Sequence, residues 1–284
     1  MRFTPSIRKS PRNAPAGFSL VELLVTLLIA SVMMTVMTGF FRASVGTRHD
    51  MGLQTEAQQG LRAIFELVTQ ELRQAGACLP QTGQFIILAG VDNGDLDELT
   101  LRIGRTDEDT LRCVKAGTTE AVTSGTVLQL GAGEGDLFAG AALAYVTPNG
   151  AIGNFYSIVA HTSDSVTIDD SVTLPVGAGV YAVDERVYRA ETMNGRDVLS
   201  VTIDGGQAYP LVEGVKEFNV IYWLEAVDPD DPMVDQSYPP DNDADWRRVR
   251  MLTIAGDVEA RDHKRDGGTM HEEGHTDVKP RNLL

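Results

Sequence analysis

The chain has 284 residues and a formal net charge of −16. This length suits a helix plus one sizeable globular domain, or two small domains. A chain this acidic repels the phosphate backbone of a nucleic acid, and the sequence contains no basic patch interleaved with aromatic residues. We therefore predict that its globular part does not bind nucleic acid.

A basic segment precedes a long apolar run. The predicted cytoplasmic leader, residues 1–17, contains Arg2, Arg8, Lys9 and Arg12 and no acidic residue. In the 24 residues from Phe18 to Phe41 the only charged side chain is Glu22. A helix of this length measures about 36 Å and can cross a bilayer core. Because the basic residues all precede it, we expect the start of the chain to stay in the cytoplasm and the chain after about Phe41 to lie outside.

The position of the small residues distinguishes this segment from an ordinary secretory signal. Such a signal has a shorter apolar region, which is followed by a small-residue cleavage site. Here "APAG" (14–17) precedes the apolar run, so cleavage there would leave the hydrophobic helix on the mature protein. Glu22 then requires a partner, because a charge near the middle of a bilayer costs roughly 3 kcal/mol on insertion scales.

The stretch "GFSLVELL" (17–24) resembles the prepilin cleavage motif of type IV pilins and type II secretion pseudopilins. The resemblance implies cleavage after Gly17 by a prepilin peptidase, N-methylation of Phe18 as the new N-terminus, and storage in inner-membrane lipid until assembly. Glycine also leaves the backbone unhindered at the cut. The alternative is a plain membrane anchor with a stray glutamate.

The same resemblance provides Glu22 with a partner. It implies that Glu22 meets the terminal amine of Phe18 in a neighbouring subunit of a filament. Two opposite charges at ~4 Å attract each other by about 4 kcal/mol at an effective dielectric near 20, which is comparable to the cost of burial. We therefore expect Glu22 to set the register of assembly more than to add stability.

An apolar stripe extends the helix beyond the membrane, and we predict one helix over residues 18–77 that ends near Gly76. The stripe recurs at steps of four and three: Leu53, Ala57, Leu61, Ile64, Val68 and Leu72. Arg62 and Glu66 form a predicted i,i+4 pair on the wet side. The glycines at 39, 46, 52 and 60 would let the helix bend or locally unwind, or would permit close helix contacts; both interpretations stay open.

Residues 78–284 are predicted to form a β-rich periplasmic or extracellular head. Short segments of strand type recur between turn signals: "QFIILAG", "DELTLRI", "TVLQL", "FYSIVAH", "DSVTIDD", "GVYAVDERVYRA", "DVLSVTI", "GVKEFNVIYWLEA" and "WRRVRMLTIAG". No βαβ alternation is present. We therefore expect an α+β, pilin-like architecture, in which the long N-terminal helix packs on an antiparallel sheet.

Several stretches of the head resemble PilW-type minor pilins: "LRQAG", "ERVYRAE", "PLVEGVKEFNVIYWL", "WRRVRMLTI" and "VKPRNLL" follow that family's order. The resemblance implies a structural protein, not an enzyme, that primes or caps a type IV pilus together with other minor pilins and the major pilin. It also implies a single-pass inner-membrane protein with a periplasmic head, later found at the tip of a pilus that serves motility or cell adhesion. A J-class minor pseudopilin of type II secretion is a close alternative.

The sequence contains no catalytic or nucleotide-binding signature of the common kinds. There is no G-x-S-x-G elbow, P-loop or dinucleotide fingerprint, and we predict no cofactor. Because filament growth needs energy, the resemblance implies an inner-membrane assembly platform with a separate cytoplasmic ATPase.

Two cysteines, Cys78 and Cys113, fall on the predicted outer side, where disulfides persist. A bridge across their separation of 35 residues would contribute roughly 3.5 kcal/mol by loop entropy and fasten the helix end to an early strand. Two free thiols, or metal binding, are the alternatives.

The stretch "HEEGH" (271–275) fits the H-E-x-x-H pattern of zinc proteases, which places two histidines on one helical face. Here Gly274 lies inside the motif, "RDGGTM" precedes it, and no apolar helix surrounds it, so we predict a solvated turn. Adventitious zinc or nickel binding and, more remotely, an anchored periplasmic metalloenzyme are alternatives.

Two acidic stretches are candidate calcium sites, because calcium prefers flexible oxygen ligands. The first is a proline-broken loop with Asp228, Asp230, Asp231, Asp235, Asp241, Asp243 and Asp245. The second is "VDNGDLDE" (91–98), which lacks the spacing of an EF-hand loop. For both stretches we favour the simpler interpretation, a hydrated loop and a turn before a strand.

Overall fold

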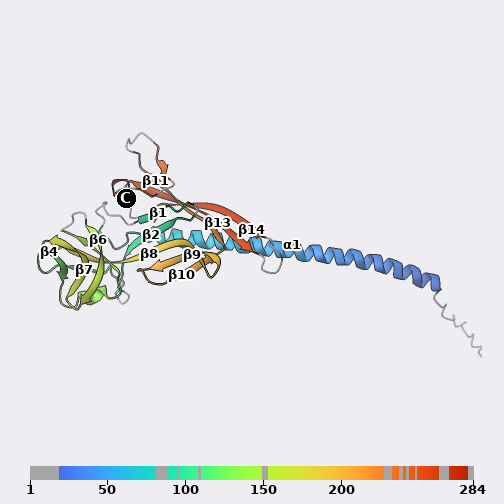
Figure 1. Ribbon diagram of the computed structural model, residues 1–284, viewed down its shortest axis with the longest axis horizontal. Coiled ribbons are helices and arrows are strands. Elements are labelled where there is room, and N and C mark those ends of the chain that lie inside the picture. The colour runs from blue at the N-terminus through green and yellow to red at the C-terminus, as the bar shows by residue number, and fades with distance from the viewer. Residues whose placement is uncertain are drawn as a thin grey trace, which may run out of the picture. The chain divides into compact units, whose positions relative to one another are not determined.

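The computed structural model describes residues 19–80, 88–94, 96–107, 110–148, 153–226, 232–236, 239–240, 243–246, 248–261 and 269–280. The chain divides into two compact units, residues 1–51 and 52–284. One long N-terminal helix, α1 (Leu20–Gln74), is followed by an antiparallel β-rich head (Figure 1). The predicted α+β, pilin-like architecture is therefore confirmed.

The second half of α1 packs on the head through the predicted stripe. The buried residues of α1 are Leu53, Ala57, Leu61, Ile64, Val68 and Leu72. Arg62 and Glu66 lie on the opposite, exposed side, where the guanidinium of Arg62 is 2.7 Å from the carboxylate of Glu66. Both parts of this prediction are confirmed, because an apolar repeat of 3.6 residues places one face of a helix against a core.

The glycines leave α1 unbroken from Leu20 to Gln74. At Gly60 a Cβ atom would lie 3.2 Å from methyl carbons of Val212 and Val258, so close contact with the head explains this glycine. At Gly39 and Gly52 nothing lies within 4 Å of such an atom. The helix ends at Gln74, two residues before Gly76.

The larger sheet has ten strands, all paired antiparallel. Its main path is β1 (Leu88–Val91), β2 (Glu98–Gly104), β8 (Gly179–Met193), β5 (Leu143–Thr147), β6 (Asn154–Thr162), β7 (Ser165–Leu174) and β4 (Val122–Gln129). Off this path, β3 (Lys115–Gly117) pairs with β8, and β9 (Arg196–Ile203) lies between β8 and β10 (Ala208–Glu213).

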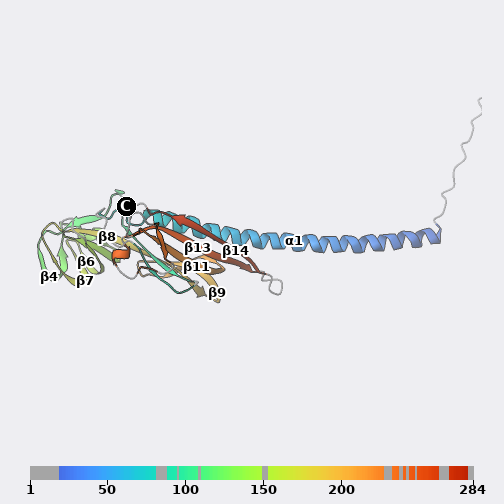
Figure 2. The ribbon, with the colours of Figure 1, turned by 90° about the horizontal axis from the view of Figure 1, so that it is seen from above.

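The smaller sheet has four strands in the order β12 (Val234–Gln236), β11 (Val215–Leu224), β13 (Val249–Arg261) and β14 (Thr269–Val278). A short helix, α2 (Asp243–Trp246), precedes β13. Figures 1 and 2 both show the second half of α1 alongside β13 and β14. This sheet is therefore a main support for the helix.

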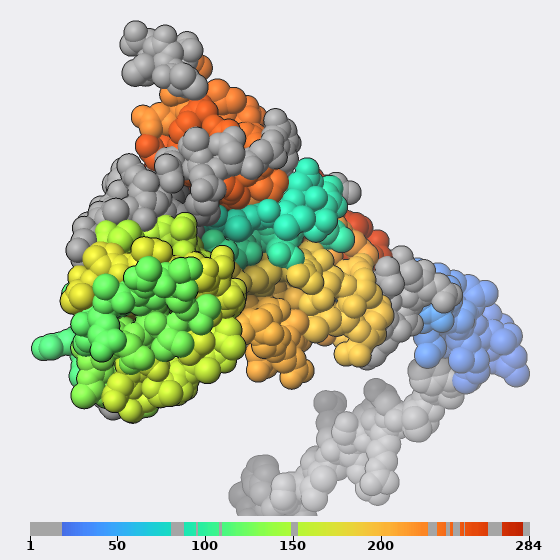
Figure 3. All heavy atoms as spheres, turned by 60° about the vertical axis from the view of Figure 1, so that its left-hand side comes forward, coloured from blue at the N-terminus to red at the C-terminus, as the bar shows by residue number. Residues whose placement is uncertain are grey.

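The described residues form two large hydrophobic cores and a third, small cluster of Leu53, Ala57 and Ala260. The first joins Ile64 and Leu72 of α1 to Leu101 of β2 and Val220 of β11. The second lies inside a lobe made by β3 to β7, the short 3-10 helix η1 (Gly135–Phe138) and the start of β8; we call it the β4–β7 lobe (114–182), and its core includes Phe138. Figure 3 shows this lobe in green and yellow beside the β9–β10 hairpin. Because β8 contributes to both cores, one strand ties them together.

All nine predicted strand segments overlap observed strands, but five further strands of the described chain were not predicted: β3, β5, β10, β12 and β14. Strand β5 is buried almost throughout and so lacks the alternation of apolar and polar residues that marks a strand with one wet face. Strand β10 contains a proline, which argues against a strand.

The predicted solvated turn at "HEEGH" is wrong, because these five residues form the middle of β14. Gly274 pairs with Gly256 of β13, and both glycines face the helix. A Cβ atom on Gly274 would lie 3.0 Å from Leu61 and 3.2 Å from Phe65 of α1. Gly274 therefore makes room for the helix. The segment is a strand because it pairs with β13, although it contains few apolar residues.

Candidate functional site

The residue predicted to direct assembly, Glu22, lies at the start of α1. Gly17 and Phe18 lie outside the described residues. From Ser19 onward, the carbonyl of Ser19 accepts the backbone N–H groups of Glu22 at 3.0 Å and Leu23 at 3.1 Å. Glu22 consequently lies in the first turn of the helix, where the exposed N–H groups favour a negative charge.

The side chain of Glu22 is exposed and makes no hydrogen bond or ion pair with any residue in the part of the chain that the structure describes. The apolar side chains on both sides of it, from Leu20 to Phe41, are also exposed. The most apolar 18-residue window of α1 has a mean hydropathy of 2.3, and none of it is buried. By length and composition this helix could span a membrane.

The hydroxyl groups of this apolar segment are satisfied within the helix. Thr26, Ser31, Thr35 and Thr38 each donate to a backbone carbonyl three or four residues earlier, at 2.5–2.9 Å. Such bonds let a hydroxyl lie in lipid without losing a hydrogen bond. Among the described polar side chains between Leu20 and Phe41, only the carboxylate of Glu22 therefore lacks an internal partner.

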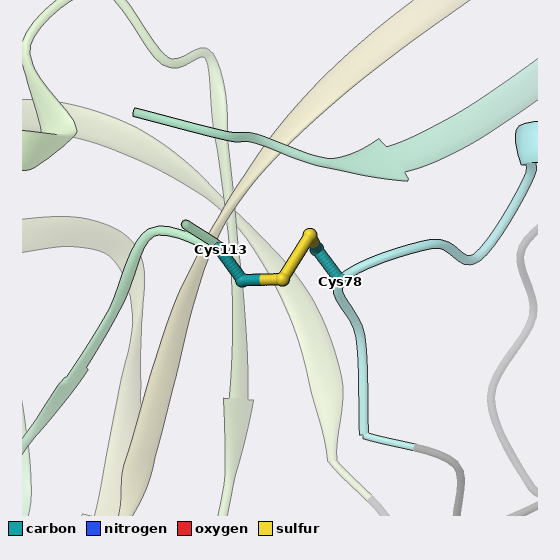
Figure 4. The surroundings of a disulfide bond; sticks show 2 residues. All are labelled: Cys78 and Cys113. Atoms are coloured by element: carbon teal, nitrogen blue, oxygen red, sulfur yellow. A yellow bond between two sulfur atoms is a disulfide. The ribbon is translucent and has the colours of Figure 1, made fainter. Parts of the chain in front are cut away.

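A disulfide joins the end of α1 to the segment before β3 (Figure 4). Cys78 and Cys113 are bonded, with their Cα atoms 5.2 Å apart. Gly104 of β2 passes beside this bridge, and a Cβ atom there would lie 2.7 Å from the carbonyl oxygen of Ala77. The pairing considered from the sequence is thus present in the structure, at a place where the two segments are already in contact.

An ion pair that was not predicted links α1 to the larger sheet. Arg186 of β8 donates to the carboxylate of Glu71, and Tyr188 lies buried beside them. Burial, followed by the neighbouring Glu71 carboxylate, raises the pKa of Tyr188, so this phenol stays neutral. The sequence shows an acid near the helix end and an arginine in "ERVYRAE", but not that the two face each other.

Asp97 in "VDNGDLDE" joins the two sheets through backbone hydrogen bonds. Its carboxylate accepts the backbone N–H of Val220 at 2.9 Å and of Asn93 at 3.3 Å, and its own N–H donates to the carbonyl of Phe218 at 2.8 Å. Burial raises the pKa of Asp97. Asp92 accepts the N–H of Gly94 at 2.8 Å, so this stretch forms the predicted turn.

Gly214 in "VEGV" lies where the chain passes from the larger to the smaller sheet. Its N–H donates to Asp197 of β9, and its carbonyl accepts from Glu259 of β13, both at 2.7 Å. Its φ is 82°, and a Cβ atom would lie 2.1 Å from the carbonyl oxygen of Glu259. Only glycine fits this crossing, which gives a physical reason for that residue in the motif.

The acidic loop is described only in part. Four of its predicted ligands lie outside the described residues: Asp228, Asp230, Asp231 and Asp241. The side chain of Asp243 is likewise outside them. Asp235 is exposed on β12, and Asp245 pairs with Arg248 at 2.8 Å. Calcium binding by this loop stays a prediction.

The histidines of "HEEGH" cannot form the zinc-protease arrangement. In β14 the side chains of His271, Glu273 and His275 lie on the exposed face, whereas Glu272 lies on the face toward α1, where it accepts from Gln58 at 3.4 Å. The zinc-protease pattern needs one helical turn between its histidines and a glutamate base beside them. In the strand β14, Glu272 points to the opposite face from both histidines, and the histidines are not one helical turn apart. This arrangement weighs against the metalloenzyme alternative.

A family profile described as the prokaryotic N-terminal methylation motif matches residues 12–38. No curated protein and no solved structure matches the chain significantly. The profile covers the cleavage motif and most of the apolar run of α1. With the long helix and β-rich head, the match supports a type IV pilin-like or pseudopilin-like protein that a prepilin peptidase processes and that its apolar helix can anchor in the inner membrane.

Proposed function

We propose that this protein is a minor pilin that primes or caps a type IV pilus together with other minor pilins and the major pilin. The observation that carries the proposal is the methylation motif at residues 12–38, followed directly by an apolar, exposed helix. Proteins with this motif are generally structural, which agrees with a scaffolding role. Cleavage between Gly17 and Phe18 would generate the mature N-terminus.

The unpartnered carboxylate of Glu22 supports assembly through the N-terminus. In a filament, the methylated amine of Phe18 from a neighbouring subunit would supply the missing positive charge. At ~4 Å and an effective dielectric near 20 this attraction is about 4 kcal/mol, similar to the penalty for placing the carboxylate in an apolar core. The pair would therefore select one register of helix against helix, with little net gain in stability.

The size and shape of the head support a position at the tip. The β4–β7 lobe adds a second hydrophobic core to the one that packs on α1. A subunit with this additional lobe is bulky for the repeating shaft, whereas the end of a filament has room for it. The membrane stage, with the head in the periplasm, and the cytoplasmic ATPase that drives growth belong to the same proposal.

Intact-mass measurement with N-terminal sequencing tests the proposal, using membrane and sheared-filament fractions of the native host. We expect a chain that starts at methylated Phe18 in both fractions. A chain that starts at Met1, or one cut after the apolar run, would make the motif accidental. If deletion of the gene abolishes protein secretion and leaves pili intact, the protein is instead a J-class pseudopilin.

A further inference from the structure

Strand β14 forms a long, regular edge of the smaller sheet. It pairs with β13 over ten consecutive residues, from Leu252 opposite Val278 to Arg261 opposite Thr269, without a register shift. Within the described chain no strand pairs with its other side. A row of backbone N–H and C=O groups along such an edge is a template for a further strand.

The opposite edge of the same sheet is a short strand, β12. Strand β12 pairs with β11 at Tyr222, Trp223 and Leu224. Further along β11, Asp97 bonds to the backbone of Phe218 and Val220. Of the two edges of this sheet in the described chain, that of β12 is only three residues long, whereas that of β14 is ten residues long.

The edge of the larger sheet at β10 is less suited than β14 to pair with an added strand. Pro210 lies within β10, and the register shifts between Pro210 and Val212. A proline lacks an N–H group and a bulge disrupts pairing, which are two ways in which proteins block an edge. Strand β14 has neither feature.

A row of carboxylates crosses the sheet and ends at the free edge. Glu273 of β14 is opposite Asp257 of β13, which is opposite Glu217 of β11. A shallow groove over Ala255 and Gly256 separates Glu217 from Glu273. Like charges directly opposite one another destabilise a sheet, so a cation at this row would relieve the repulsion.

The same face contains acceptors without donors. Asn219 donates its amide to Glu217 at 2.7 Å, and its own carbonyl oxygen is buried without a hydrogen bond. One carboxylate oxygen of Asp257 is also buried and unbonded, while the other lies 3.2 Å from Nδ1 of His271. Buried acceptors of this kind usually have a donor. These two acceptors lie on β11 and β13, away from the free edge, so it is the exposed carboxylates of β14 itself, Glu273 and Asp277, that favour a positively charged partner.

We propose that β14 is a docking edge for an extended segment of a partner protein that has lysine or arginine at alternate positions. The segment adds to the free edge as a further strand and places its basic side chains beside Glu273 and Asp277. Backbone hydrogen bonds provide affinity, and the alternating charges select which face of the added strand lies beside the carboxylates. A second copy of this chain is a poor occupant, because its own β14 offers no lysine or arginine to the carboxylates. This inference goes beyond the proposed filament assembly and does not depend on it.

A peptide-binding experiment on the full-length protein in nonionic detergent tests this proposal. The probe is a labelled ten-residue peptide of alternating lysine and valine. The matched control has the same composition as a block of lysines followed by a block of valines. We expect the alternating peptide to bind at least about tenfold more tightly, because only it can form a strand with one charged face. It should also slow amide hydrogen exchange within residues 269–278.

Charge-reversed variants locate the binding site. Glu273→Lys should weaken binding of the alternating peptide about fivefold. Glu120→Lys, at another exposed acid outside this sheet, should leave it unchanged. Equal binding of the two peptides, or no slowing of exchange in β14, would show that only charge attracts them and would overturn the proposal. Self-association that disappears in Glu273→Lys would overturn it as well, because the occupant would then be a second copy.

Discussion

The two halves of α1 belong to one continuous helix but have opposite surroundings. From Leu20 to Phe41 the apolar side chains are exposed, and the hydroxyl groups bond to their own backbone. From Leu53 to Leu72 the apolar side chains form one buried stripe, and charged residues cover the opposite face. The first half is suited to lipid or to other helices, whereas the second half already has its partner in the head.

The largest expected difference between the halves concerns their glutamates. Glu22→Ala should be processed and inserted normally, but its incorporation into sheared filaments should fall at least about tenfold, because the register-setting pair is lost. Glu56→Ala changes an exposed acid of the second half and should assemble normally. Immunoblots of membrane and filament fractions measure both. Normal incorporation of Glu22→Ala would contradict the assembly role of that residue.

The disulfide fastens the end of the second half. Replacing both Cys78 and Cys113 by alanine should lower the free energy of unfolding of the head by about 3.5 kcal/mol, because the open chain gains loop entropy on unfolding. Denaturant unfolding of the full-length protein in detergent measures this change. Reduction of the unmutated protein is the control and should give a similar loss. An unchanged midpoint in both samples would mean that the bridge is not needed for stability.

Matched leucine substitutions compare the packing of the two halves. Leu72→Ala should lower the free energy of unfolding of the head by about 3 kcal/mol, because Leu72 is fully buried in the core and its removal leaves a cavity. Leu27→Ala, in the exposed apolar half, should leave head unfolding unchanged. The same denaturant experiment reports both. Equal losses would show that the first half also packs on the folded head.

The smallest effect is expected for the surface pair of the second half. Arg62→Ala removes the ion pair with Glu66, in which both side chains are largely exposed. Exposed pairs gain little because water screens them and the side chains lose freedom. Thermal unfolding of the head should not change measurably. A clear loss would mean that Arg62 has a further contact in the folded protein.

Much of the helix could be predicted from sequence because its signals are local. The repeat from Leu53 to Leu72 identified the buried face, and Gly76 indicated where the helix ends. The strands with alternating or β-branched residues were also found. Strand β5 was missed because it is buried on both faces, and β14 because its residues are mostly polar.

The candidate site also has a part that the sequence predicted and a part that it did not. The motif around Gly17 and Glu22 was recognisable from a short stretch, because processing and membrane insertion read local sequence. The contacts of Asp97 with Val220, and of Glu71 with Arg186, join residues more than a hundred positions apart. No local pattern reports such a contact.

The sequence alone determined the basic composition of residues 1–17, the apolar run, the buried stripe of α1 and the β-rich class of the head, since each depends on residues that are neighbours along the chain. Only the tertiary structure decided that "HEEGH" is an edge strand, that Gly274 makes room for Phe65, and that Gly214 is the crossing between the sheets. The physical reason is that these roles depend on which distant backbone lies alongside. Strand pairing and close packing determine which distant backbone lies beside a segment, whereas the composition of the segment does not.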